Sequence, residues 1–405
     1  MYKHYSWVMV TALSAPALLL LSACSDGGSG IGAQQVDVGE PLTRAVSSAG
    51  GKDYFPGFRP VSSVSVDSAP KGSGSAFTGS VFPAGGRENL SFYGFNSSGT
   101  QWRIDTNPSC VGTVLTSVNG EPSIVILDSD ARTDGKGPVS VTVATAFAVD
   151  DGEKLWGPTE VPGPSTGGLI FANTPKGLTA EKAPGTVLDA DTGSVVEVDA
   201  GVAVYEHHGT VLFDSGVVLT AVDAGSGEAL WSTGEMSRPP GADPDARPVF
   251  RGQYGPSSGG VVILEWATAS GAGVPVAYDL LTGENLVQVP GEPAGIAKVD
   301  DASGVTLLPA QQANGAYTLT AVHPGKGLLW RQEFRDLEVT AVGGVAVYAR
   351  INGAAARIDL ESGAVLESGQ FVLPEAVLAD GSAIFASRES SAGYVLAKPE
   401  PTPAP

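Results

Sequence analysis

Cysteine, histidine and basic residues are scarce in this sequence of 405 residues. It contains 2 cysteines and 4 histidines, and its 23 Lys and Arg residues stand against 43 Asp and Glu residues, for a formal net charge of −20. A surface of this charge repels phosphate backbones, so we expect no nucleic acid among the partners. The few histidines and cysteines leave little material for a metal centre or a hydrolytic triad, and no His-Glu-x-x-His or Walker motif is present.

Apolar runs long enough to span a bilayer as a stable helix, which takes about 20 residues, are also missing. The longest run extends from Trp7 to Leu21, after a short basic start at Lys3 and His4. This arrangement is typical of a secretory signal peptide. Leu21-Ser22-Ala23-Cys24 follows at once, with two small residues before a thiol that can act as a nucleophile.

These four residues resemble the lipobox of bacterial lipoproteins. The resemblance implies that residues 1–23 are removed and that Cys24 carries a diacylglyceryl group and a fatty acid such as palmitate. Two or three acyl chains anchor a protein firmly. We therefore expect the chain on the outer face of the cytoplasmic membrane, or on the outer membrane if the host is Gram-negative. Residues 24–54 predict a flexible tether, and residues 399–405 a disordered proline-rich tail.

The remaining segment, residues 55–398, is rich in glycine and poor in charge. Gly accounts for 54 residues of the chain and charged residues for only 16%. This composition favours short strands and many turns over helices. Once Cys24 is lipidated, Cys110 has no partner for a disulfide, and we interpret it as a small buried apolar residue.

One phrase recurs along this segment: a strand, a tight turn with Asp and Gly, and a second strand with Trp. The clearest copy is Val217–Trp231, with Asp223, Gly227 and Trp231 in the three positions. A second copy has Asp279 and Gly283, and others end at Trp102, Trp156 and Trp330. The turn glycines fall at residues 99, 152, 193, 227, 283, 327 and 363, an average spacing of 44 residues. That period indicates a β-propeller of four-stranded blades.

The phrase resembles the PQQ-like, or quinoprotein-type, propeller repeat, in which Asp caps the turn and Trp packs between blades. Seven copies are visible, and residues 374–398 supply three further strands. A strand at Arg59–Val66 would complete this last blade and close the ring, so we expect eight blades, with seven as the alternative. Glu197 and Glu367 replace Trp in two copies, where looser packing is expected.

The family's name suggests a quinone-dependent enzyme, but the adjacent cysteines that such enzymes carry are missing here. We expect no organic cofactor, and interpret the tryptophans as packing residues. Asp128, Asp130 and Asp134 resemble the start of a calcium loop, without the bidentate Glu that should follow. A polar hairpin explains them equally well. Neighbours on a strand point to opposite faces, so His207 and His208 are poor partners for one metal, and we interpret them as solvated loop residues.

Two functions remain open. The first is a non-enzymatic binding or scaffolding module for a protein or ligand of the cell envelope. The layout is similar to that of lipoproteins of outer-membrane assembly, with a lipid anchor, a tether and an eight-bladed propeller. The longest repeat intervals, 99–152 and 227–283, then predict the largest recognition loops. The alternative is an extracytoplasmic enzyme or small-ligand-binding protein that uses the central channel. Converging polar residues in the channel would favour the second, and a bland apolar channel the first.

Overall fold

The computed structural model describes most of the propeller segment and two short pieces before it. The described residues are 36–37, 42–45, 54–82, 90–106, 112–134, 137–172, 185–252, 254–255, 258–268, 273–387 and 393–400. Cys24 and Cys110 lie outside them, so the expectations for these residues are not addressed. In the described part of the chain, no helix is long and apolar enough to cross a membrane.

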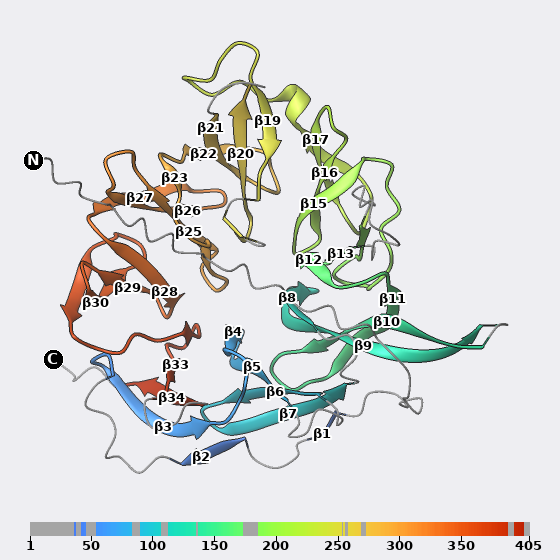
Figure 1. Ribbon diagram of the computed structural model, residues 1–405, viewed down its shortest axis with the longest axis vertical. Helices are drawn as coiled ribbons and strands as arrows, with labels where there is room; N and C mark the ends of the chain where they lie inside the picture. The colour runs from blue at the N-terminus through green and yellow to red at the C-terminus, as the bar shows by residue number, and fades with distance from the viewer. Residues whose placement is uncertain are drawn as a thin grey trace, which may run out of the picture.

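Eight antiparallel sheets surround a central channel, so the fold is the expected all-β propeller with eight blades (Figure 1). The described helical content is one 3-10 turn, η2 (Thr233–Glu235). We name the strands of each blade A to D from the channel outward and number the blades in chain order. The seven copies of the phrase, with the further strands at residues 374–398 and Arg59–Val66, thus predict the blade count correctly.

The first four blades span residues 71–232. Blade 1 consists of β4 (Lys71–Ser73), β5 (Ala76–Val81), β6 (Leu90–Asn96) and β7 (Gly99–Thr106), and blade 2 of β8 (Thr113–Val118), β9 (Glu121–Asp134), β10 (Gly137–Ala148) and β11 (Lys154–Val161). Blade 3 has β12 (Ser165–Gly167), β13 (Ile170–Phe171) and β14 (Thr186–Val187), and blade 4 has β15 (Val202–His207), β16 (Thr210–Asp214), β17 (Leu219–Asp223) and β18 (Ala229–Ser232). In blade 3 the D strand is reduced to a bridge between Leu188 and Val195.

The last four blades complete the ring. Blade 5 consists of β19 (Arg247–Phe250), β20 (Val261–Ala267), β21 (Val274–Asp279) and β22 (Asn285–Gln288). In blade 6, β23 (Glu292–Pro293) and β24 (Lys298–Asp300) share the inner position before β25 (Val305–Gln311), β26 (Tyr317–His323) and β27 (Gly327–Phe334). Blade 7 has β28 (Leu337–Gly343), β29 (Ala346–Ile351), β30 (Ala354–Asp359) and β31 (Val365–Gly369), and blade 8 has β32 (Ala376–Val377), β33 (Ala383–Ala386), β34 (Tyr394–Pro399) and β3 (Phe58–Val64).

Blade 8 closes the ring with strands from both ends of the domain, as the sequence predicts. β3 pairs with β34, from Phe58 opposite Pro399 to Val64 opposite Tyr394. The strand continues to Pro399, one residue into the expected tail, and Glu400 N–H donates to Gly57 O. Closure of this kind removes the free edges that a linear array of blades would leave at its two ends.

The range expected to be a flexible tether contains two strands. β1 (Val36–Asp37) pairs with the outer strand of blade 1, and β2 (Thr43–Ala45) with the outer strand of blade 8. Leu42 joins the two blades, because its N–H donates to Thr100 Oγ1 at 2.9 Å and its carbonyl accepts from Ser65 N–H at 3.3 Å. We call residues 36–37 and 42–45 together the N-terminal strap. The strap lies across the seam where the ring closes.

Tryptophan holds neighbouring blades together at four seams. The indole Nε1 of each Trp donates to a turn carbonyl of the next blade at 2.6–2.8 Å; the pairs are Trp102 with Val149, Trp156 with Ala190, Trp231 with Leu280 and Trp330 with Leu360. The side chain of each Trp packs closely against the turn glycine of that blade, where a Cβ would come within 2.3–2.8 Å of it. We call this pair of contacts the Trp clasp.

The clasp also corrects the alignment of one repeat. In the sequence Asp150 stands two residues before Gly152, whereas Asp223 stands four residues before Gly227, and this spacing predicts a turn two residues shorter in blade 2. Instead Gly152 N–H donates to Ala148 O, as Gly227 N–H donates to Asp223 O. The two turns therefore have the same length, and Ala148 stands where blades 3, 4, 5 and 7 have Asp. In those copies the carboxylate caps the turn, and hydrogen bonds from Ser226 hold the pKa of Asp223 below its usual range.

Candidate functional site

The turns of the propeller divide between two faces. In blades 4, 5 and 7 the turn between strands C and D bonds to the turn between A and B, through Ala224 N–H to Gly209 O, Leu280 N–H to Gly260 O and Leu360 N–H to Val345 O. Both kinds of turn therefore lie on one face, which we call the AB face. The opposite face carries the B–C turns and the connections between blades. The turn of every repeat phrase is a C–D turn and therefore lies on the AB face.

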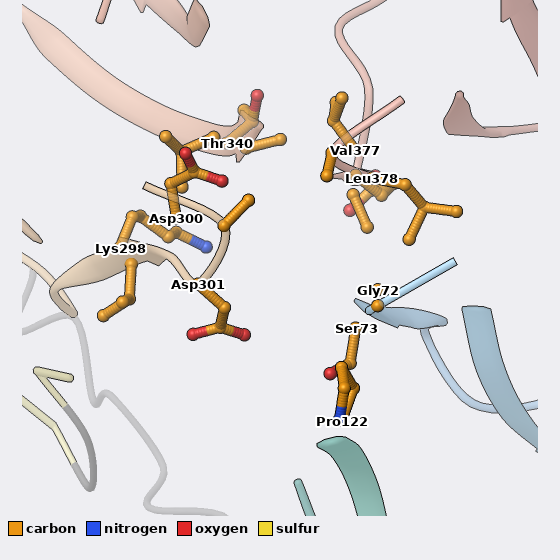
Figure 2. A pocket seen from close by; sticks show the side chains of 17 residues that line it. Gly72, Ser73, Pro122, Lys298, Asp300, Asp301, Thr340, Val377 and Leu378 are labelled. Atoms are coloured by element: carbon orange, nitrogen blue, oxygen red, sulfur yellow. The ribbon is translucent and has the colours of Figure 1, made fainter. Parts of the chain in front are cut away.

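A cavity of about 240 Å³ lies at the AB-face end of the central channel. The inner strands of blades 1, 6, 7 and 8 and Pro122 at the start of β9 line it (Figure 2). Because each of these strands comes from a different repeat, no short sequence motif could reveal the cavity. We call it the channel cavity.

One wall of the channel cavity is charged. Lys298, Asp300 and Asp301 come from the end of β24 and the turn that follows it. Asp300 is buried, and its Oδ2 accepts from Ser303 Oγ at 2.5 Å while its carbonyl accepts from Gly304 N–H at 2.7 Å. These bonds form the same capped turn that the repeat uses elsewhere. The following residue, Asp301, is thereby held at the edge of the cavity.

Asp301 has an altered acidity in this position. Loss of solvent around the carboxyl group and the neighbouring charge of Asp300 raise the pKa of Asp301 to about 6. The side chain nevertheless remains accessible to water at the cavity edge. A carboxyl group of this kind exchanges protons near neutral pH and binds cations above its pKa.

The facing wall is small and apolar. Gly72, Val377 and Leu378 lie opposite the charged wall in Figure 2, with Ser73 and Pro122 below them. A Cβ on Gly72 would lie 2.9 Å from Leu378 Cδ2, so the two blades are already in close contact here. The cavity therefore combines a wall that accepts positive charge with a wall that accepts hydrocarbon.

A second cavity of about 610 Å³ lies between blades 7 and 8, towards the opposite face. Thr340 and Glu375 line both cavities. Glu338 and Arg350 form an ion pair of 3.8 Å at its edge. The channel wall of these two blades is therefore accessible from both faces. By the criterion set from the sequence, the polar residues that converge in the channel favour an enzyme or a small-ligand-binding protein over a scaffold with an apolar channel.

The residues proposed for calcium lie elsewhere, on the long hairpin of β9 and β10 that projects beyond the ring (Figure 1). Asp128 is buried, and Asp130 and Asp134 pair with Val141 and Gly137 in regular strand register. The segment is thus an extended strand rather than a calcium loop, which matches the hairpin interpretation. No group of three metal-binding side chains occurs among the residues that the structure describes. Calcium binding stays a prediction.

His207 and His208 do not behave as expected. Their rings stack, with centroids 3.8 Å apart and 20° between planes. The expectation of opposite directions is wrong because β15 ends at His207 and the chain turns at His208, whose φ is 46°. His208 is exposed, but burial, together with His208, lowers the pKa of His207 to about 3.

Glu206, the residue before this pair, is a buried carboxylate that the sequence did not single out. Its Oε2 accepts from Leu169 N–H of blade 3 at 2.6 Å, and its Oε1 accepts from Gly209 N–H at 3.0 Å. Burial raises the pKa of Glu206, with a further contribution from Asp189. Glu206 thus joins blades 3 and 4 at a seam that lacks a Trp clasp. The alternation of apolar residues in the sequence does not predict that Glu206 joins two blades.

Two Gly-x-Ser-x-Gly stretches, at residues 163–167 and 255–259, do not form a nucleophile elbow in the described residues. That motif requires a strand followed by a helix, whereas Ser165 lies in β12 and is followed by β13. Ser165 Oγ donates to Gly168 O at 2.8 Å. Ser257 lies outside the described residues. The tryptophans of the repeat line no part of the channel cavity.

No model of a known protein family matches the sequence, and no curated protein matches it. Solved structures align with most of the chain. BamB from Moraxella catarrhalis is 12% identical, with 84% of this chain and 99% of that chain covered and a TM-score of 0.40. The uncharacterized protein lmo1340 from Listeria monocytogenes EGD-e is 10% identical, with 82% and 90% covered and a TM-score of 0.37. A europium-containing methanol dehydrogenase is 12% identical, with 81% and 84% covered and a TM-score of 0.30. These likenesses concern the fold alone, and the chain is an eight-bladed β-propeller.

Proposed function

We propose that the chain is a lipid-anchored binding module of the bacterial cell envelope and that it holds its partner at the channel cavity. The observation that carries the proposal is the cavity itself, with Asp300 and Asp301 on one wall and Val377 and Leu378 on the other. Clefts with a few placed polar groups on an apolar surround are the usual form of binding sites. Leu21 to Cys24 supports the membrane anchor.

A second candidate is an enzyme that uses the same cavity. The raised pKa of Asp301, about 6, suits a general acid or base near neutral pH. The cavity lining includes the hydroxyls of Ser73 and Thr340 but no histidine or cysteine among the described residues. Acid–base chemistry by the carboxylates is the catalytic mode that this lining supports best, with Lys298 beside them as a further proton-exchanging group. Binding requires fewer assumptions.

The test is site-specific photo-crosslinking in intact cells with the full chain. A photoreactive residue replaces Thr340 in the cavity, and in a matched variant it replaces Val217, which is exposed on the opposite face. We expect a discrete product from position 340 that Asp301→Asn weakens, and none of the same size from position 217. Equal products at both positions, or none at position 340, would refute the cavity as the binding site.

The anchor has its own control. Cys24→Ala should move the protein out of the membrane fraction, because the acyl chains supply the membrane affinity. Retention of this variant in the membrane fraction would contradict the lipoprotein assignment and leave the crosslinking result unaffected.

A further inference from the structure

We propose that the AB face is the docking surface for a cationic, partly apolar polypeptide segment, and that one Lys or Arg side chain of this segment enters the channel cavity. The inference deepens the proposed function, on which it rests, by giving the chemistry of the partner. It follows from three features of one face: its carboxylates, its exposed apolar side chains and the two walls of the cavity.

Carboxylates gather on the AB face because the repeat places its capped turns there. Exposed acidic side chains occupy turns or strand starts of seven consecutive blades; they are Glu121, Asp150, Asp151, Glu153, Asp191, Glu228, Glu284, Asp301, Glu361 and Asp380. Basic side chains on this face are Lys154, Lys326, Arg59 and Lys398, with Lys298 in the cavity. The face is therefore acidic on blades 2 to 7 and attracts a cationic partner.

The same face exposes large apolar side chains. They lie in the turns or at the AB-face ends of outer strands in blades 3 to 7; they are Val195, Leu230, Leu281, Leu328, Val345, Val365 and Leu366. Val345 is 75% exposed and Leu281 59%. Apolar residues among charges are typical of protein interfaces.

The channel cavity fits a long basic side chain entering from this face. The four methylenes of lysine, or the three of arginine, would lie along Val377 and Leu378, as the apolar stems of these side chains do elsewhere. The charged head would meet Asp300 and Asp301 on the facing wall. Lys298 opposes this charge, but Glu375 adds a third carboxylate to the lining, so the cavity remains net negative.

Two other occupants are less compatible with these features. A metal ion would need several ligands converging on one point, and no group of three metal-binding side chains occurs in the described ranges. A bilayer surface with anionic headgroups would be repelled by a chain with a formal net charge of −20. A basic polypeptide with apolar residues satisfies both the charge and the exposed hydrocarbon of the face.

The test measures binding of short labelled peptides to the purified full chain by fluorescence anisotropy. The probe is a peptide of alternating Lys and Leu, and the controls are Glu–Leu and Lys–Ser peptides of the same length. We expect the Lys–Leu peptide to bind about tenfold more tightly than either control, and its affinity to fall with added salt. Equal affinity for the Lys–Leu and Glu–Leu peptides would overturn the proposal.

Variants then locate the surface. Glu228→Gln/Glu284→Gln/Glu361→Gln removes three charges from the AB face, and Glu235→Gln/Asp245→Asn/Glu333→Gln removes three exposed charges from the opposite face. The first set, and Asp301→Asn alone, should weaken binding by about threefold or more, while the second set should change it little. Equal weakening by both sets would mean attraction to net charge only, and would overturn the proposal. If the peptides fail but the product at position 340 persists, the partner has another chemistry and the proposed function stands.

Discussion

The Trp clasp gives a prediction that a matched pair of variants can test. Gly283 and Gly227 occupy the same turn position in adjacent blades, with φ of 71° and 73°. At Gly283 an added Cβ would lie 2.8 Å from Cγ of Trp231, whereas at Gly227 the nearest atom is Val198 Cγ2 at 4.0 Å. The difference arises because blade 3 has Glu197 where blade 4 has Trp231.

Both variants place alanine at a positive φ, so the backbone contribution to the loss of unfolding free energy is the same and cancels when the two are compared. Alanine at positive φ costs about 1 kcal/mol, which the entropy of the unfolded chain offsets in part. Gly283→Ala adds the overpacking cost, about 1–3 kcal/mol, and disturbs the bond of 2.7 Å from Trp231 Nε1 to Leu280 O, worth about 1 kcal/mol. We therefore expect Gly283→Ala to destabilise the chain by about 2–4 kcal/mol more than Gly227→Ala.

Urea unfolding of the two variants measures the difference directly. Trp231→Val should remove most of the excess cost of Gly283→Ala, because the clashing ring is then absent, and a double-mutant cycle would show this as a coupling energy. If the two glycine variants are equally destabilised, the indole of Trp231 does not constrain the turn at Gly283, and the clasp does not hold the seam between blades 4 and 5 together.

Three further predictions concern the strap, the histidine pair and the channel cavity. Deleting residues 25–45 uncovers the outer strands of blades 1 and 8; amide exchange should rise in β3 but not in β31, and unchanged protection of β3 would contradict a role in closure. His207, with its pKa lowered to about 3, favours the folded state above the unfolded pKa of 6.5 and loses this contribution as pH falls; between pH 7 and pH 5 the wild type should lose about 2 kcal/mol more than His207→Phe, and parallel curves would refute the assignment. Binding of the Lys–Leu peptide should weaken as pH falls through 6, because Asp301, facing Asp300, Lys298 and Glu375, becomes protonated; a pH profile that Asp301→Asn leaves unaltered would exclude this group.

Several features of the site lay beyond the sequence for definite physical reasons. The channel cavity is built from inner strands such as β4, β24, β28 and β32, which belong to four different repeats, and β4 precedes the other three by more than 200 residues. Stacking of His207 on His208 depends on a local turn that breaks strand alternation. The bond from Glu206 to Leu169 depends on how blades 3 and 4 pack. Each of these features depends on the distance between residues of different repeats or on a local turn. The repeat pattern in the sequence describes only the strands and turn within a single repeat.

The repeat itself, by contrast, was determined by local chemistry. A capped turn needs Asp and Gly at fixed spacing, and alternating apolar residues make a half-buried strand, so the phrase around Asp223, Gly227 and Trp231 specifies one unit of a blade. The number of units and the spare strand at Arg59–Val66 then determined eight blades and the closure. The tertiary structure alone decided which residues meet across the channel and how the strap crosses the seam. These contacts join residues far apart in sequence, whose proximity arises only when the ring has closed.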